Sequence, residues 1–242
     1  MSVTRLFVEA DLAIGGEVPL SEAQAHHLRH VMRRADGADL LLFNGRDGEW
    51  RGRLGLSGKK AASATVGALS RGQTAEPDLW LCFAPIKRAR IDLIAEKATE
   101  LGARRLRPVI TQRTIAERVN LERMRANVVE AAEQCNLVFV PEVTEPVKLP
   151  ALMLAWPKDR ALVYCDETAA IADPLAALQP LKAPVAVLIG PEGGFTDEEK
   201  ALLKSLPFVT AISLGPRIMR ADTAAVAAMT LVQAMLGDWH GN

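Results

Sequence analysis

The sequence has few cysteines and no long apolar run. Its three cysteines, Cys82, Cys135 and Cys165, are odd in number, widely spaced and set among apolar neighbours, without the spacing of a metal site. We therefore expect reduced thiols packed inside a cytoplasmic protein, with no bound metal. No apolar run approaches the roughly 20 residues that cross a bilayer, and residues 1–9 lack the apolar core of a signal peptide. We expect neither a membrane protein nor a disulfide-bonded secreted one.

A net charge is also absent, because 29 Lys and Arg balance 29 Asp and Glu. The charge is nevertheless uneven along the chain. Residues 84–125 hold eleven basic residues against five acidic ones, whereas residues 126–242 hold eight against fourteen. The basic central segment favours a polyanionic partner. Solvated helix faces would give the same pattern, and charge alone does not separate the two interpretations.

The residues that are present divide near residue 75. Before it, strand-like segments at 5–8, 39–43 and 49–54 are separated by turn-forming residues, including Asn-Gly at 44–45 and Asp-Gly at 47–48. One helix interrupts the strands. Ser21 and Gln24 have the spacing of a capping box at its start, and it carries Ala25, Leu28 and Met32 on one apolar stripe. We predict a small β-barrel domain at 1–72, with a linker at 70–77.

The second part, 73–242, alternates strands and helices. An alternating pattern predicts a parallel sheet covered on both faces, with ligands bound beyond the carboxyl ends of its strands. The fold class is therefore α/β, preceded by a small β module. Strands are expected at 79–84, 106–110, 161–165, 185–189 and 208–213, and helices at 89–101, 121–136, 173–179, 197–205 and 222–236.

Two glycine-containing turns follow two consecutive strands of this second part. The first, Gly190-Pro191-Glu192-Gly193-Gly194, ends at Thr196, which forms a capping box with Glu199. The second runs from Leu214-Gly215 to Arg220 and leads into an apolar helix. A strand, a glycine turn and a helix N-terminus expose backbone N–H groups to a ligand. We therefore expect one composite pocket.

Common nucleotide motifs are missing from both turns. Neither is a G-x-x-x-x-G-K-[ST] loop, and no G-x-G-x-x-G follows the first strand, which disfavours a triphosphate site and a Rossmann site. What remains is a pocket rich in peptide groups with apolar walls from Ile189, Leu214, Ile218 and Met219. Such a pocket suits the purine ring of a nucleoside-like cofactor.

The paired motifs at 189–195 and 214–224 resemble those of SPOUT methyltransferases, and within them the family that methylates N3 of a uridine in 16S ribosomal RNA. Three further segments, 26–33, 97–102 and 130–135, resemble the PUA-like domain and the two central motifs of that family. The resemblance implies a trefoil-knotted C-terminal domain, S-adenosyl-L-methionine as cofactor, and a homodimer acting on 16S rRNA or the assembled small subunit. The implied cofactor-binding residues are Ile189, Gly190, Pro191, Glu192, Gly193, Gly194, Leu214, Gly215, Ile218, Met219, Arg220, Thr223 and Ala224.

The chain departs from the family pattern at two places. The second motif usually ends in Arg-Thr-Glu-Thr, whereas this chain has Arg220-Ala221-Asp222-Thr223. The family typically has Gly-Arg after the second central motif, where this chain has Asn136-Leu137. The arginine that the family has at this position is therefore missing from this chain.

Methylation of uracil N3 needs its proton removed and the resulting charge stabilised. Arg220 is permanently charged and is our candidate for stabilising the charge on the uracil oxygens. Asp222 or Glu192 could accept the proton if burial raised its pKa. Each carboxylate also has a structural interpretation: Asp222 could cap the last helix with Thr223, and Glu192 could pair with a lysine of the helix that follows it. No metal is required.

Basic side chains near the first helix and in the central segment are candidate RNA contacts. For the arginines at 29, 33 and 34, phosphate contact is the better explanation, because residues 23–35 contain no acidic side chain, and a solvated helix face is the alternative. His26 and His30 lie one turn apart, but no third metal ligand accompanies them. The last helix is apolar enough to pack in the core or to form a dimer interface. The candidate RNA-binding residues are Arg29, Arg33, Arg34, Lys87, Arg88 and Arg113.

Two other functions remain open. The chain could be a SPOUT enzyme that methylates another RNA, such as a transfer RNA 2′-hydroxyl. It could also be a module that binds RNA and cofactor without catalysis. Methyl-transfer assays on ribosomal and transfer RNA distinguish the first alternative from methylation of 16S rRNA. Cofactor binding without turnover would favour the second alternative.

Overall fold

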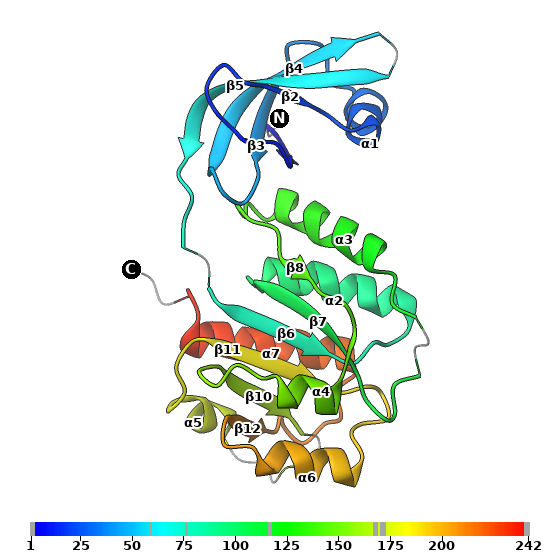
Figure 1. Ribbon diagram of the computed structural model, residues 1–242, viewed down its shortest axis with the longest axis vertical. Helices are drawn as coiled ribbons and strands as arrows, with labels where there is room; N and C mark the ends of the chain where they lie inside the picture. Colours follow the sequence, from blue (N-terminus) through cyan, green and yellow to red (C-terminus); the bar gives the residue numbers. More distant parts are fainter. Residues whose placement is uncertain are drawn as a thin grey trace. The chain divides into compact units, whose positions relative to one another are not determined.

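The computed structural model describes residues 3–58, 60–75, 77–115, 118–166, 169 and 173–239. The chain forms two compact units (Figure 1). The first comprises residues 1–75 together with 132–140, and the second comprises 76–131 and 141–242. The sequence places the boundary at 72/73 and gives each domain one continuous segment, so the contribution of 132–140 to the first unit is new.

The first unit is built on a five-stranded sheet in the order β1-β3-β4-β5-β2. β1 and β3 are parallel, and the other pairs are antiparallel. Apolar side chains of the sheet and of the first helix form its core, among them Leu6, Leu28, Leu42 and Val66. The strands are β1 (Thr4–Phe7), β2 (Glu17–Pro19), β3 (Asp39–Phe43), β4 (Glu49–Ser57) and β5 (Ala61–Arg71).

The helix of this unit begins as predicted but does not continue as a regular α-helix. Ser21 and Gln24 form the expected capping box at the start of α1 (Glu22–His26). The chain then widens into a π-helical turn, η1 (His27–Val31). Ala25 and Leu28 are buried, whereas Met32 is 38% exposed. The predicted stripe is therefore wrong at Met32, because a π turn shifts the following residues around the helix axis.

A buried arginine holds residues 132–140 against the strands of the first unit. The guanidinium of Arg5 donates to the backbone carbonyls of Ala132 (2.8 Å), Glu133 (2.9 Å) and Leu137 (2.6 Å), and its Nε pairs with Glu49 at 2.7 Å. The Arg5 and Glu49 side chains are only 6% and 8% exposed. The carbonyls at the end of a helix lack intrahelical partners, so this arginine satisfies groups that would otherwise be buried without one.

Asp47 makes the stability of the first unit depend on pH. Its Oδ2 accepts from the Leu12 backbone N–H (2.9 Å) and from the Asn44 amide (2.7 Å), and these bonds hold the pKa of Asp47 below its ordinary value. A carboxyl whose pKa is lower in the folded state stabilises the fold above its unfolded pKa, and this stability is lost as the pH falls.

We therefore expect the urea midpoint of the first unit to fall between about pH 5 and pH 3, and to fall less steeply in Asp47→Asn, which keeps an acceptor but cannot titrate. Urea unfolding across this pH range measures the difference. Equal slopes in the two proteins would contradict the role of Asp47.

The second unit is a parallel sheet in the order β12-β10-β11-β6-β7-β8, with β9 also paired to β7. β6 and β11 are buried along their whole length, as expected for central strands covered on both faces. The strands are β6 (Leu79–Phe83), β7 (Arg105–Ile110), β8 (Glu142–Val143), β9 (Val147–Lys148), β10 (Ala161–Cys165), β11 (Val185–Ile189) and β12 (Val209–Ile212).

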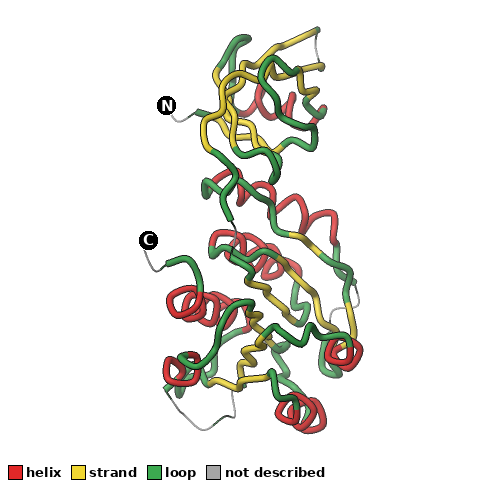
Figure 2. Tube along the Cα trace, turned by 60° about the vertical axis from the view of Figure 1, so that its left-hand side comes forward, coloured by secondary structure: helices red, strands yellow, loops and turns green. Residues whose placement is uncertain are grey.

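Helices cover both faces of this sheet (Figure 2). Side chains of α4 and α6 join one core with those of β6, β10 and β11, while α7 contacts β6 and β11 and packs against α2. No helix in the described part of the chain is long and apolar enough to span a membrane. The helices are α2 (Arg88–Glu100), α3 (Leu121–Gln134), α4 (Leu149–Leu154), α5 (Pro174–Leu178), α6 (Asp197–Ser205) and α7 (Ala221–Leu236).

The strand order requires the chain to return across the sheet after its edge strand. β12 lies at the edge beside β10, yet α7, the next element, contacts β11 and β6. The chain therefore crosses back past β10 between Ile212 and Ala221, along the second glycine-containing loop. The trefoil knot that the resemblance implies would require the chain to pass through a loop of the backbone at this crossing.

Candidate functional site

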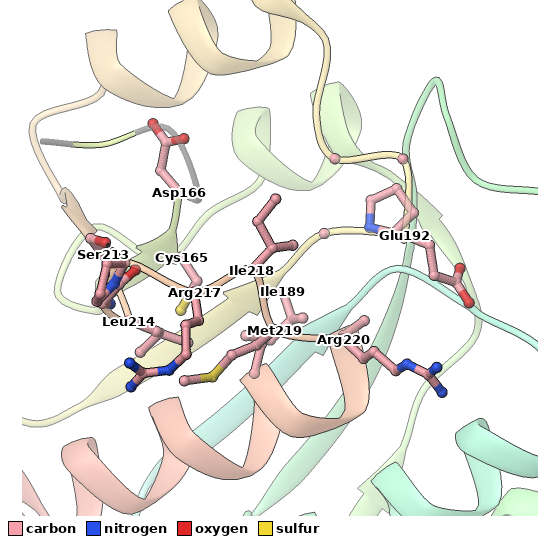
Figure 3. A pocket seen from close by; sticks show the side chains of 18 residues that line it. Cys165, Asp166, Ile189, Glu192, Ser213, Leu214, Arg217, Ile218, Met219 and Arg220 are labelled. Atoms are coloured by element: carbon pink, nitrogen blue, oxygen red, sulfur yellow. Dashed lines mark hydrogen bonds between the residues drawn. The ribbon is translucent and has the colours of Figure 1, made fainter. Parts of the chain in front are cut away.

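A pocket of about 410 Å³ lies at the carboxyl ends of the strands of the second unit. Both glycine-containing loops line it, one after β11 and the other after β12, together with the end of β10 and the start of α7 (Figure 3). The volume is within the range of small-molecule sites, and the position is where parallel sheets bind ligands. The predicted residues that line it are Ile189, Gly190, Pro191, Glu192, Gly193, Gly194, Leu214, Gly215, Ile218, Met219, Arg220 and Ala224.

The first loop is shaped by the ring of Phe195. A Cβ placed on Gly190 would lie 2.6 Å from Cε2 of Phe195, which is buried and packs edge-on against Tyr164. Gly194 adopts a φ of +66°, and its N–H donates to the Pro191 carbonyl at 2.9 Å. Glycine is thus required at 190 for space and favoured at 194 for conformation.

The end of this loop is fixed by hydrogen bonds from two directions. Thr196 and Glu199 form the predicted capping box at the start of α6. The Glu199 carboxylate is buried and also accepts from the Gln112 backbone N–H at 2.8 Å. The Arg113 guanidinium donates to the Gly193 carbonyl at 2.9 Å. Arg113, a predicted RNA contact, therefore holds the loop in place.

The second loop leaves backbone donors available to a ligand. Gly215 has a φ of +102°, and its N–H donates to the Ser213 hydroxyl at 3.3 Å. For the N–H groups of Leu214, Ile218 and Met219, the structure gives no acceptor among the described residues. Buried polar atoms of a ligand need such partners, so the loop suits a planar, hydrogen-bonding group such as a purine.

The end of β10 adds two pocket residues that sequence reasoning missed. Burial raises the pKa of the Cys165 thiol to about 12, so it is not a nucleophile at neutral pH. Asp166 is fully buried at the end of the pocket opposite Glu192 (Figure 3), where its carboxylate pairs with Lys204 at 2.8 Å and Lys200 at 3.7 Å of α6. Cys165 and Asp166 lie at the carboxyl end of the strand predicted at 161–165, and this position is the sequence feature that could have identified them as pocket residues. Ser213 and Ala221 were also missed, whereas Pro216 and Arg217 belong to the loop from Leu214 to Arg220 that was expected to line the pocket.

Charged side chains gather at the opposite end of the pocket. The Arg220 guanidinium is exposed and forms no ion pair with any described residue. Glu192, which is 37% exposed, pairs with Arg90 of α2 at 3.7 Å, and not with a lysine of the following helix. Asp222, whose side chain is 14% exposed, also pairs with Arg90, at 3.9 Å. Neither Asp222 nor Thr223 lines the pocket.

The capping interpretation of Asp222 is wrong in its details. Arg220 occupies the N-cap position of α7, without a side-chain cap, and Asp222 is the second residue of the helix. Its carboxylate accepts from the Thr223 backbone N–H at 3.0 Å. An acidic side chain in the first turn stabilises a helix by interacting with the helix dipole. Asp222 therefore has a structural role, whichever residue acts as the general base.

The candidate RNA contacts fall into two groups. Arg29 donates to the carbonyls of Ser57 and Ala61, and Arg34 donates to the Thr4 hydroxyl at 3.0 Å, so both stabilise the first unit. Arg33 and Lys87 are exposed, and Arg33 has a positive φ of 52°. The side chain of Arg88 lies outside the described part of the structure.

The rings of His26 and His30 lie 4.7 Å apart. The residues that the structure describes include no group of three or more His, Cys, Asp or Glu arranged to hold a metal ion. The histidine pair therefore has no third ligand of these kinds in the described part of the chain.

Comparisons with known proteins match both units. The sequence model of the RNA methyltransferase domain matches residues 74–233, and that of the RNA methyltransferase PUA domain matches residues 20–67. The ribosomal RNA small subunit methyltransferase E of Synechocystis is 31% identical over 96% of this chain and 78% of its own length. The enzyme of the same name from Rickettsia conorii is 29% identical over 97% of both chains.

Solved structures agree with the sequence relatives. The crystal structure of a ribosomal RNA small subunit methyltransferase E from Neisseria gonorrhoeae bound to S-adenosyl methionine has a TM-score of 0.89 and 26% identity, over 98% of this chain and 100% of that one. A putative methyltransferase from Legionella pneumophila in complex with the same cofactor has a TM-score of 0.86 and 27% identity, over 97% and 98%.

The fold and the matches define an RNA methyltransferase of the SPOUT class with a PUA-like N-terminal domain. More narrowly, the chain belongs to the ribosomal RNA small subunit methyltransferase E family.

Proposed function

We propose that this protein transfers a methyl group from S-adenosyl-L-methionine to N3 of a uridine in the 16S rRNA of the small ribosomal subunit. The observation that carries the proposal is the pocket formed by the two glycine-containing loops, in a chain that resembles two solved structures containing this cofactor. The relatives named as small-subunit rRNA methyltransferases support the RNA substrate. The uridine and its N3 position come from the motif resemblance.

The pocket residues fit the cofactor. Its adenine and ribose need hydrogen-bond partners, which the N–H groups of the second loop that have no described acceptor can supply, and apolar walls, which Ile189, Leu214 and Met219 supply. The glycines of the first loop leave room for close approach of the backbone. When bound, the cofactor supplies an electrophilic methyl group on a sulfonium, and no metal is needed.

The residues at the charged end of the pocket suit the remaining chemistry. A carboxylate of this chain would take the N3 proton, and the bound cofactor would supply the methyl group to N3, with the carbon–sulfur bonding pair left on sulfur. Arg220 has no described partner and can stabilise the negative charge on the uracil oxygens. Asp222 is the more buried candidate base, and Glu192 lines the pocket. Both remain candidates.

A second copy of the chain would complete the site. Ile218 lines the pocket from the second loop and is 89% exposed, so a second copy of the chain packed on this loop would cover it. We include a homodimer in the proposal, with the RNA meeting exposed basic residues such as Arg33 and Lys87. Light scattering should give twice the chain mass of 26.2 kDa, and a monomer at micromolar concentration would remove this part of the proposal.

The test is the methylation state of ribosomal RNA in cells that lack the protein. Nucleoside mass spectrometry of 16S rRNA should show the loss of one 3-methyluridine, restored by the parent gene and not by one encoding Arg220→Ala. Unchanged 16S rRNA with a methyl group lost from transfer RNA would favour the alternative substrate. Cofactor binding without any lost methyl group would favour a catalytically silent module.

A further inference from the structure

Arg90 of α2 contacts both sides of the charged end of the pocket. Its Nη1 lies 3.7 Å from Oε1 of Glu192, and its Nε lies 3.9 Å from Oδ2 of Asp222. Glu192 belongs to the first loop, and Asp222 to the first turn of α7, directly after the second loop. One side chain therefore links three segments that are far apart in the sequence.

The helix that carries Arg90 is itself fixed in place. α2 packs against α7, with Ile94 and Ala98 of α2 beside Ala225 and Met229 of α7. The Arg90 side chain is 29% exposed, so neighbouring residues cover most of it and restrict its conformations. It lies between two carboxylates whose charges would otherwise repel each other across the pocket end.

We propose that Arg90 is a positioning residue that holds the first loop and the start of α7 at the spacing the cofactor requires. The inference rests on the proposed function, because it assumes that these two segments enclose S-adenosylmethionine. Arg90 does not line the pocket, so it acts through Glu192 and Asp222 and not by contacting the cofactor. Partly exposed ion pairs contribute little to global stability, so its loss should change binding more than folding.

Titration calorimetry of the full chain with S-adenosylmethionine tests the proposal. Arg90→Ala should raise the dissociation constant roughly threefold to fivefold, with an unchanged melting temperature, and Arg90→Lys should recover part of the loss. The matched control is Arg123→Ala, which removes another arginine paired with a carboxylate, that of Asp92 on the same helix, away from the pocket. The control should bind like the parent.

Binding of a second ligand, S-adenosylhomocysteine, distinguishes a positioning role of Arg90 from a purely electrostatic one. S-adenosylmethionine carries a sulfonium charge, and S-adenosylhomocysteine, the demethylated product, does not. If Arg90 acted only through its charge, its removal would strengthen binding of the cation relative to the product. If Arg90 positions the two segments, both ligands should weaken to the same extent. Combining Arg90→Ala with Glu192→Gln should then give less than the sum of the two single effects.

The outcomes distinguish the inference from the proposed function. If the Arg90→Ala variant binds both ligands like the parent, or binds S-adenosylmethionine more tightly, the positioning role is overturned and the proposed function stays intact. Additive effects of Arg90→Ala and Glu192→Gln overturn it as well. A parent protein that binds neither ligand overturns the proposed function, and with it the inference.

Discussion

Replacing Arg220 with alanine should lower the rate of methyl transfer to small-subunit rRNA by about 10² to 10³-fold, the usual cost of removing a group that stabilises a developing charge. The melting temperature should not change, because the Arg220 guanidinium is exposed and has no described partner to lose. The dissociation constant of S-adenosylmethionine should change by less than about threefold, because the charge develops on the substrate.

Single-turnover assays with saturating cofactor measure this effect. Arg220→Lys keeps the charge but loses the planar fork, so it should recover only part of the rate. Arg125→Ala, which removes an exposed arginine of α3 paired with Glu145, is the matched control and should react like the parent. Transfer by Arg220→Ala at the parent rate would show that the charge is stabilised elsewhere.

The second large effect is on stability. Arg5→Ala should lower the free energy of unfolding of the first unit by about 3 kcal/mol or more, because breaking a buried ion pair leaves a charge without its partner. Among the described residues, Glu49 would keep only Arg71 as an ion-pair partner, at 3.4 Å, and the carbonyls of Ala132, Glu133 and Leu137 would lose the Arg5 donor.

Urea unfolding and hydrogen exchange of residues 4–7 and 39–43 measure this loss. The matched control is Arg46→Ala, which removes an arginine paired with Asp11 at the surface, where the side chains are 52% and 92% exposed. A surface pair of this kind contributes less than about 1 kcal/mol. If Arg5→Ala unfolds at the same urea concentration as Arg46→Ala, the buried pair does not stabilise the unit as we infer.

The α/β part of the fold could be predicted closely from the sequence because its signals are local. Strands that are buried on both faces appear as short apolar runs, and two of them, Ala161–Cys165 and Val185–Ile189, have the predicted bounds. The helix at Asp197–Ser205 also matches, since a capping box marks its start. The residues within each of these elements are enough to predict its type and its ends, because the hydrophobic pattern and the capping residues are local.

Elements that depend on a distant partner were missed. β5 (Ala61–Arg71) consists mainly of Ala, Ser and Gly, which have weak strand preference, and it forms because β4 pairs with it. α4 (Leu149–Leu154) is too short for a periodic pattern. β8 and β9 are two-residue strands defined only by their pairing with β7.

The same division applies to the site. The glycine loops could be recognised from their sequence, whereas Arg90 reaches the end of the pocket near Glu192 only through the packing of α2. Asp166 lies at the opposite end, directly after β10, where it pairs with Lys204 of α6. One departure from the family now has a physical reason. Asn136, where the family has glycine, adopts a φ of +64°, and asparagine tolerates this conformation better than other side chains. The absence of an arginine at Leu137 has no structural explanation.

A crystal structure of the full chain grown with S-adenosylmethionine tests the central claim most directly. We predict that the adenosine lies between residues 190–194 and 214–220, held mainly by backbone N–H and carbonyl groups, with the methyl group facing the end of the pocket that holds Arg220. Cofactor bound anywhere else on the chain, or no binding at a concentration that saturates its relatives, would contradict the account.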